Sequence, residues 1–266
     1  MWIDTHCHLD ASEFAGEHDL MASRAAQQGV GCIVIPAVER ANFQTVATLA
    51  ANNTNCVYAL GIHPTYVPHA DIADLQYLRE AIPAALRDPR FVAIGEIGLD
   101  FFIPELRVTA MREKQELFYV EQLKIARDFD LPVLLHVRRS QDTLLKYLRR
   151  IPTRGGCAHA FNGSLQQAQQ FIALGFKLGF GGAMTFTRAL QIRRLASELP
   201  LASLVLETDA PDISPSWLHP ARNAPEQIPQ IGNVLAQLRG IDSATIAAQT
   251  SANALVALPR LALSRY

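Results

Sequence analysis

Histidine and carboxylate side chains recur along this chain at positions that suit the binding of metal ions. His6 and His8 are two residues apart at the end of an apolar segment, so in a strand both imidazoles project from one face while Cys7 projects from the other. Neighbouring imidazoles are common ligands of zinc and related ions. Because a His-x-His pair also arises by chance, the prediction depends on the other candidate ligands.

Four further candidate ligands each follow a short apolar segment. An ionised carboxylate at such a place is unfavourable unless it is paired or bound to a cation. Each residue alone has a structural alternative, such as an ion pair with an arginine for the glutamate or a core position for the first histidine. Their shared place at strand ends favours one common site, and the four are Glu96, His136, His159 and Asp209.

The number of candidate ligands indicates more than one ion. A single catalytic zinc ion takes three or four protein ligands, whereas this set holds four imidazoles and two carboxylates. Such a set suits two divalent ions with a carboxylate shared between them. Two ions about 3.5–4 Å apart can hold a hydroxide and polarise a phosphoryl or carbonyl oxygen.

The segments that must position these side chains are short, β-prone and nearly continuous in apolar residues, as in strands buried on both faces of a parallel sheet. Segments with helical spacing lie between them, including residues 111–129, 144–150 and 165–174, with Ser164 and Gly175 as the expected caps of the last. We expect strands at residues 2–6, 32–37, 57–61, 92–96, 133–136, 156–159, 176–180 and 204–207.

About eight repeats of strand and helix without a linker predict an α/β fold, a single (β/α)8 TIM-type barrel. We expect one metal-dependent hydrolase domain over residues 1–266, with residues 225–261 as closing helices. A doubly wound open sheet is the alternative, but no GxGxxG or GxxxxGK[ST] motif follows the first strand. In a barrel, side chains at the carboxyl ends of the strands meet at one opening.

Composition limits the class of protein. Of the 266 residues, 49% are hydrophobic and 18% are charged, which allows a large core, and the net charge of −1 gives no general attraction to nucleic acid. The arginine pairs at 138–139, 149–150 and 193–194 are read as solvated helix faces, although a nuclease that grips one strand end would need only such local positive charge. The four cysteines form no CxxC pair, and neither a signal peptide nor a membrane-spanning segment is expected. These features predict a cytoplasmic enzyme without a membrane association or a stable protein partner.

Several motifs resemble those of the TatD family of metal-dependent deoxyribonucleases, within the amidohydrolase superfamily. The resemblance extends over essentially the whole chain and keeps the order of the motifs. They are residues 6–8 (HCH), 61–64 (GIHP), 95–100 (GEIGLD), 159–163 (HAFNG), 207–211 (ETDAP) and 222–223 (RN).

The resemblance implies how the ligands are shared between two metal ions. It assigns His6, His8 and Asp209 to one ion and His136 and His159 to the other, with Glu96 shared by both. Some relatives in the superfamily bridge their ions with a carboxylated lysine, and here Glu96 occupies that position. Asp209 would be both a ligand and the proton acceptor for the attacking water.

Four residues near this set have two interpretations each. Arg222 would clamp a phosphate or form a surface salt bridge, and His63 would touch the scissile group or cap a turn. Asp100 would position a ligand histidine or accept N–H bonds in its own turn. Glu207 would support the site from outside or compete with Asp209 as a ligand.

Two departures from the family pattern concern the substrate more than hydrolysis. Phe101-Phe102 stands where relatives commonly have a tyrosine, and Ala224 stands where an acidic residue often follows Arg-Asn. The function predicted is hydrolysis of DNA phosphodiesters at a strand end by zinc, manganese or magnesium. The alternatives are hydrolysis of small phosphoesters or of carboxylic or aminoacyl esters, and a metal-binding barrel without catalysis.

Overall fold

Eight parallel strands form the centre of the molecule, and each pairs with the next in sequence order. The computed structural model describes residues 1–265, so Tyr266 of the expected domain 1–266 lies outside the described residues. The predicted (β/α)8 barrel is confirmed. The strands are β1 (Trp2–Asp4), β2 (Val30–Pro36), β3 (Cys56–Leu60), β4 (Phe91–Asp100), β5 (Val133–Arg138), β6 (Gly156–Ala158), β7 (Phe176–Phe180) and β8 (Leu204–Leu206).

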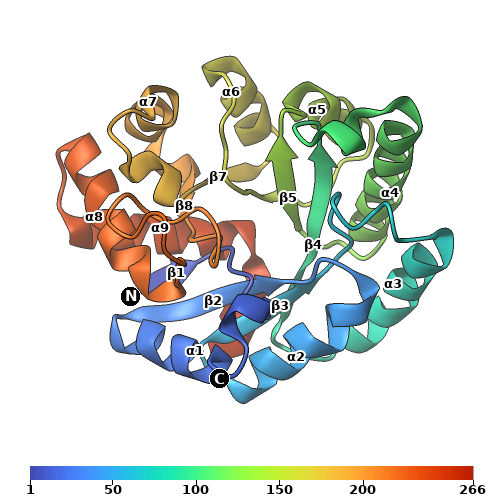
Figure 1. Ribbon diagram of the computed structural model, residues 1–266, viewed down its shortest axis with the longest axis horizontal. Coiled ribbons are helices and arrows are strands. Elements are labelled where there is room, and N and C mark those ends of the chain that lie inside the picture. The colour runs from blue at the N-terminus through green and yellow to red at the C-terminus, as the bar shows by residue number, and fades with distance from the viewer. Residues whose placement is uncertain (266) are drawn as a thin grey trace.

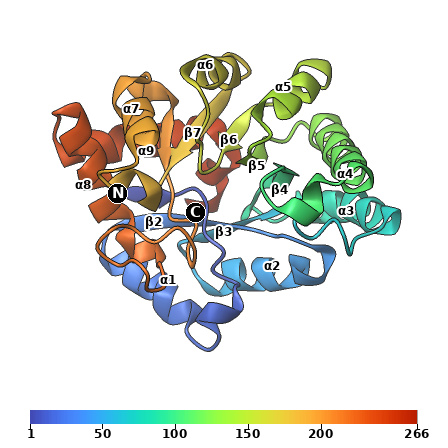
Figure 2. The ribbon, with the colours of Figure 1, turned by 45° about the horizontal axis from the view of Figure 1, so that its top comes forward.

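Helices follow the strands and surround the barrel (Figure 1). Turning the molecule shows α1 to α6 in succession around the outside of the strands (Figure 2). The helices are α1 (His18–Gln27), α2 (Phe43–Asn52), α3 (Ile72–Ala85), α4 (Thr109–Asp128), α5 (Gln141–Arg150), α6 (Leu165–Ala173), α7 (Leu190–Glu198), α8 (Ile228–Arg239) and α9 (Ser243–Ala257).

The caps expected for α6 are both present. The Ser164 hydroxyl accepts a hydrogen bond from Gln167 N at 3.1 Å, and Gln167 Oε1 accepts one from Ser164 N at 2.9 Å. Gly175, just beyond the helix, has a φ of +85°, which is a conformation that favours glycine. Local sequence therefore determines where this helix begins and ends.

Two expectations about segments were wrong. The fourth strand was expected to end at Glu96 but continues to Asp100, because residues 97–100 pair with residues 135–138 of β5. The pair Arg138–Arg139 was expected on a helix face. Arg138 instead ends β5, and Arg139 lies in the turn before α5 with a φ of +56°. The extra strand length and this turn bring both arginines to the carboxyl end of the barrel.

The C-terminal helix α9 lies in the segment expected to form closing helices, and it covers the amino end of the barrel. Its buried Ala254 and Ala257, with Leu258 and Leu261 after it, pack with inward-facing strand residues such as Val34. Hydrogen bonds tie this segment to carbonyls where strands begin. Asn253 Nδ2 donates to Leu204 O at 2.7 Å, and Arg260 donates to Phe91 O. The carboxyl end of the barrel is therefore the end left open for a site.

Backbone and side-chain contacts join the last strand to the first. Thr5 N donates to Leu206 O at 3.0 Å, and Asp209 N donates to His6 O at 2.8 Å. The buried Asp4 carboxylate accepts from Thr208 N at 3.0 Å, from Thr208 Oγ1 at 2.6 Å and from His6 N at 3.2 Å.

Among the described residues, no helix combines the length and the apolar composition that spanning a membrane requires.

Candidate metal centre

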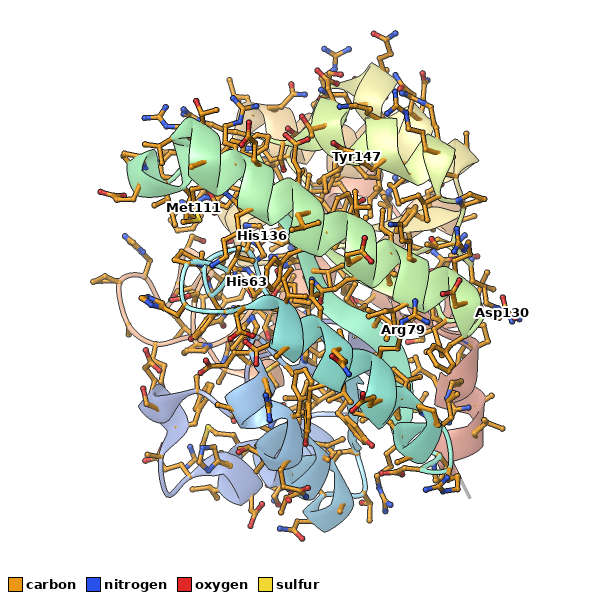
Figure 3. The ribbon with its side chains drawn as sticks, turned by 90° about the vertical axis from the view of Figure 1, so that its right-hand side faces the viewer. His63, Arg79, Met111, Asp130, His136 and Tyr147 are labelled. Carbon is orange, nitrogen blue, oxygen red and sulfur yellow. The ribbon has the colours of Figure 1, made fainter. Side chains whose placement is uncertain are left out.

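The six predicted ligands meet at the carboxyl ends of β1, β4, β5, β6 and β8. The described residues contain three overlapping groups whose ligand atoms lie within 4.8 Å of one another, and His63 joins the six predicted ligands in them. Figure 3 views this region from the side of α3 and α4. His63 and His136 lie toward the end of α4 that carries Met111 and away from Asp130. Since α4 starts where β4 has ended, this is the open end of the barrel.

Glu96 lies at the centre of the cluster, and its side chain is 1% exposed. The register of β4 against β5 is interrupted between Ile94 and Ile97, so Glu96 lies in an irregular part of the strand. The preceding Gly95 permits the close approach to β5, because a Cβ there would lie 2.6 Å from Leu134 Cβ. The two strands thus place one buried carboxylate between two sets of imidazoles.

One oxygen of Glu96 faces the first set. Glu96 Oε2 lies 3.0 Å from His6 Nε2 and 3.3 Å from His8 Nε2. Asp209 Oδ1 lies 3.7 Å from both of these nitrogens. As predicted from their spacing, the two imidazoles project to the same side, while the Cys7 thiol is buried and donates to Ala210 O. Four atoms that can bind a cation therefore share one small space.

The other oxygen of Glu96 faces the second set. Glu96 Oε1 lies 2.9 Å from His136 Nδ1, 3.6 Å from His159 Nε2 and 3.4 Å from His63 Nε2. His63 Nε2 is also 2.9 Å from His136 Nδ1. His63 was not among the predicted ligands, although it too closely follows a buried strand, β3. That position at a strand end is the feature of the sequence that could have identified it.

Two more carboxylates lie beside imidazoles of this cluster. Asp100 Oδ2 lies 3.1 Å from His136 Nε2, while its Oδ1 accepts hydrogen bonds from Phe102 N at 2.8 Å and Ile103 N at 3.1 Å. Asp100 therefore contacts His136 and also accepts the N–H bonds of its own turn. Glu207 Oε1 accepts from Ala160 N at 2.5 Å and lies 3.4 Å from His159 Nδ1, whereas His159 Nε2 faces Glu96. Such carboxylates fix the tautomer and the ring orientation of a ligand histidine.

The donor atoms fit divalent cations. Ligand bonds of 2.0–2.1 Å at angles of 90–109° place two ligand atoms about 2.9–3.4 Å apart, near the shortest separations around Glu96. Glu96 Oε2 makes no hydrogen bond in spite of its close imidazole neighbours, and neither does Glu207 Oε2, although both atoms are buried. Native proteins rarely leave buried carboxylate oxygens without a partner. A cation between these groups would satisfy Glu96 Oε2.

The pKa values show how the carboxylates and imidazoles act on one another. Burial raises the pKa of Glu96, but the surrounding imidazoles, His63 first, lower it by more, so it lies well below its usual range. Burial lowers the pKa of His8, but the nearby carboxylates, Glu96 first, raise it by more, to about 9. Burial likewise lowers the pKa of His159, but the nearby carboxylates, Asp209 first, raise it by more, to about 10. Burial keeps the pKa of His6 low, at about 3. The cluster therefore favours positive charge near Glu96.

An open cavity of about 1250 Å³ leads to this cluster. Its walls include His8, His63, His136, His159 and Asp209, so five of the groups above are accessible from it. This volume exceeds the 300–1000 Å³ of ordinary small-molecule pockets. The cavity can therefore admit a substrate larger than a small ester.

The structure brings His63, but not Arg222, into the cavity wall. His63 Nδ1 lies 2.6 Å from Thr65 Oγ1, a contact within its own turn, and its Nε2 faces the cluster. Arg222 is instead paired with Glu17 at 2.7 Å and donates to Glu13 O, which matches the surface salt bridge considered as its alternative. Its role as a phosphate clamp stays a prediction.

Comparison with known proteins agrees with this arrangement. The TatD related DNase family matches residues 3–258. The uncharacterized metal-dependent hydrolase YjjV of Escherichia coli (strain K12) is 45% identical over 241 residues, which are 90% of each chain. The 3'-5' ssDNA/RNA exonuclease TatD of the same strain is 34% identical over 260 residues, covering 94% of this chain and 96% of that protein. The crystal structure of E. coli YjjV, a TatD homolog, has a TM-score of 0.90 with 42% identity, covering 97% of this chain and 98% of that chain.

A (β/α)8 barrel with imidazoles and carboxylates gathered at the carboxyl ends of its strands defines the class of metal-dependent hydrolases, and this chain is an enzyme of that class. Within the class, the chain belongs to the TatD related DNase family. The resemblance found in the sequence motifs is thereby confirmed.

Proposed function

We propose that this enzyme hydrolyses phosphodiester bonds at the end of a single DNA strand, with two divalent metal ions. His6, His8 and Asp209 would hold one ion, and His136 and His159 would hold the other, with Glu96 binding both. The observation that carries this proposal is that separate sets of imidazoles face the two oxygens of Glu96. A carboxylate placed in this way suits a bridging ligand.

The two ions, when bound, would polarise a phosphoryl oxygen and make a water molecule a stronger nucleophile. Asp209 would accept the proton of that water. Its side chain is 14% exposed and lines the cavity, so a water molecule and a substrate can both reach it. Glu96 stays ionised in the buried centre and keeps the ligand set together.

His63 would act at the substrate side of the second set. Its Nε2 faces the cluster beside His136 Nδ1, and its Nδ1 is held by Thr65. The fixed ring can donate a hydrogen bond to an oxygen of the scissile phosphate. Asp100 and Glu207 would keep the rings of His136 and His159 in the orientation that the ions require.

The choice of DNA as the substrate is supported by the family and by the cavity. Relatives that share 34% identity over nearly the whole chain are named 3'-5' ssDNA/RNA exonucleases. The cavity of about 1250 Å³ has room for a strand end. The high share of imidazole ligands favours zinc or manganese over magnesium.

The test is the shortening of end-labelled single-stranded DNA by metal-stripped protein, with and without added zinc, manganese or magnesium. Asp209→Asn serves as the control, because it keeps the size of the side chain and removes its capacity to accept a proton. We expect shortening that requires metal and is lost in Asp209→Asn. Folded, metal-loaded protein that leaves DNA intact but hydrolyses bis(p-nitrophenyl) phosphate would contradict the proposal and support a small-ester hydrolase instead.

A further inference from the structure

We propose that Phe102, Arg138 and Arg139 form a binding site for the unpaired base and the phosphate next to the scissile bond. This inference rests on the proposed function, and it identifies residues that would select a single strand. We call these three residues the Phe102 platform. Each of them lines the same cavity as the metal centre.

The platform is built where two neighbouring strands end. Asp100 pairs in register with Arg138 on β5, and Phe101 N donates to Arg138 O at 2.9 Å, so Phe102 follows directly on this contact. The strand β4 had to extend beyond Glu96 for the two segments to meet. Residues 36 positions apart in sequence thus form one continuous surface on the rim of the cavity.

The Phe102 ring is accessible and already lies against positive charge. It is 42% exposed, although a large apolar ring on the surface gains free energy when it is covered. The guanidinium carbon of Arg138 lies 4.0 Å from the ring centroid, and that of Arg139 lies 4.8 Å from it. Aromatic rings and guanidinium planes are the two surfaces on which proteins stack unpaired bases.

The two arginines also supply charge for a phosphate. Arg139 is exposed and forms no ion pair with any carboxylate of the described residues, and Arg138 makes only a long contact of 3.6 Å with Asp100. The chain as a whole gives no such attraction, because its net charge is −1. Local positive charge at the rim is what a polyanionic strand requires and a small neutral ester does not.

The platform is connected to the metal centre through one residue. Phe102 N donates to Asp100 Oδ1 at 2.8 Å, and Asp100 Oδ2 lies 3.1 Å from His136 Nε2. The backbone at Phe102 is therefore tied to the candidate ligand His136 through the short, buried Asp100 side chain. A base stacked on Phe102 would place its own phosphate near the metal centre. Because bases inside a duplex have no free face, this mode of binding favours an unpaired base.

The chain offers a matched control elsewhere on its surface. Tyr77 on α3 is also 42% exposed, and the guanidinium carbon of Arg40 lies 4.2 Å from its ring centroid. This pair has the same chemistry as the platform, but neither residue lines the cavity. Tyr77→Ala therefore removes an exposed ring and its cation–π contact without touching the proposed site.

The experiment measures binding of metal-loaded protein to a short phosphorothioate oligonucleotide that resists cleavage, by fluorescence anisotropy. The variants are Phe102→Ala, Phe102→Trp, Arg139→Gln and Tyr77→Ala, each with its metal content measured. Each is tested with the normal oligonucleotide and with one that lacks the bases of its last two nucleotides. We expect Phe102→Ala to weaken binding of the normal strand about 5- to 100-fold.

The effects on binding affinity of removing the Phe102 ring and of removing the terminal bases should not be additive. Phe102→Ala should bind the strand without terminal bases as the unchanged protein does, and Phe102→Trp should bind the normal strand at least as well as the unchanged protein. Arg139→Gln should reduce the salt dependence of binding by about one phosphate contact. Tyr77→Ala should bind both strands like the unchanged protein.

The proposal would be overturned if Phe102→Ala lost the same factor of affinity for both strands. It would also be overturned if the loss of affinity in Phe102→Ala were within twofold of the loss in Tyr77→Ala. If the unchanged protein degrades DNA in that case, only the platform is wrong. If the unchanged protein neither binds nor shortens DNA but hydrolyses bis(p-nitrophenyl) phosphate, the proposed function itself is wrong and the platform fails with it.

Discussion

Replacing Glu207 by glutamine separates two possible roles of this buried carboxylate. Glu207 Oε1 accepts from Ala160 N at 2.5 Å and lies 3.4 Å from His159 Nδ1. A glutamine of nearly the same size keeps an oxygen for Ala160 N. It loses the negative charge that faces the imidazole. Space for the side chain exists only because residue 179 is glycine, since a Cβ there would overlap the Glu207 carboxylate.

The expected effect is on metal affinity and not on the number of ions bound. Carboxylates that orient a ligand histidine typically contribute a factor of about 10–100 in metal affinity or activity. This range corresponds to about 1.4–2.8 kcal/mol. Because His159 is proposed to hold one of the two ions, we expect only that ion to lose affinity by such a factor in Glu207→Gln.

The measurement has two parts. Elemental analysis of protein equilibrated with excess zinc gives the number of ions per chain, and competition with a chelator of known affinity gives the dissociation constants. Glu96→Gln is the comparison, since it changes the central carboxylate itself. We expect Glu207→Gln to bind two ions, one of them with a higher dissociation constant than in the unchanged protein. We expect Glu96→Gln to bind fewer than two ions.

Either of two results would refute this reasoning. If Glu207→Gln binds one ion fewer even at saturating zinc, Glu207 is a ligand, as the sequence alone allowed. If both constants equal those of the unchanged protein, the contact between Glu207 and His159 does not orient the ring for metal binding.

Three further results are expected. Glu96→Ala should lower phosphodiesterase activity by more than about 100-fold, because loss of a shared ligand affects metal binding more than loss of a supporting carboxylate. Activity within tenfold of normal at saturating metal would contradict the bridging assignment. Zinc affinity should rise between pH 6 and pH 8, because the pKa values of His8 and His159 are about 9 and about 10 without metal, so both carry protons that an ion must displace. Calorimetry in buffers of different ionisation enthalpy would show this proton release. Its absence would contradict the protonated state of the two imidazoles. Burial raises the pKa of Asp4 from 3.8 to about 8, so the contribution of this carboxyl to stability is full below pH 4 and is lost as the pH rises through 8. In urea unfolding of the metal-free proteins, the unchanged protein should therefore lose stability between pH 5 and pH 8 more steeply than Asp4→Asn, by at most about 1.4 kcal/mol per pH unit. Equal slopes would exclude this carboxyl as the cause.

The barrel and the meeting of the six candidate ligands could be predicted because they depend on local patterns. Short apolar segments alternating with helical ones predict a parallel barrel, and polar residues at the ends of those segments must then converge at one opening. The relation of His6 to His8 needed only the alternation of side chains along a strand. None of these inferences required knowledge of which side chains touch.

The supporting contacts could not be predicted, because they join positions far apart in sequence. Glu207 alternates with Asp209 along the chain, so the pattern offered two candidates for one ligand. The contact of Glu207 with His159, together with the space left by Gly179, is the observation that favours a supporting role over that of a ligand. His63 was predicted to touch the scissile group or to cap a turn, although it follows a buried strand as the candidate ligands do and lies against Glu96.

The arginines at positions 138 and 139 show why a charge pattern alone was misleading. Two adjacent arginines on a helix face point into solvent, and in the sequence this pair comes just before a helical segment. The pairing of β5 with the extended β4 places Arg138 on the cavity rim, and the positive φ of Arg139 turns the chain there. The same extension brings Phe102 to the arginines. A chain of low net charge can therefore still present local positive charge beside its candidate metal centre, because the strands carry these arginines to the rim of the cavity.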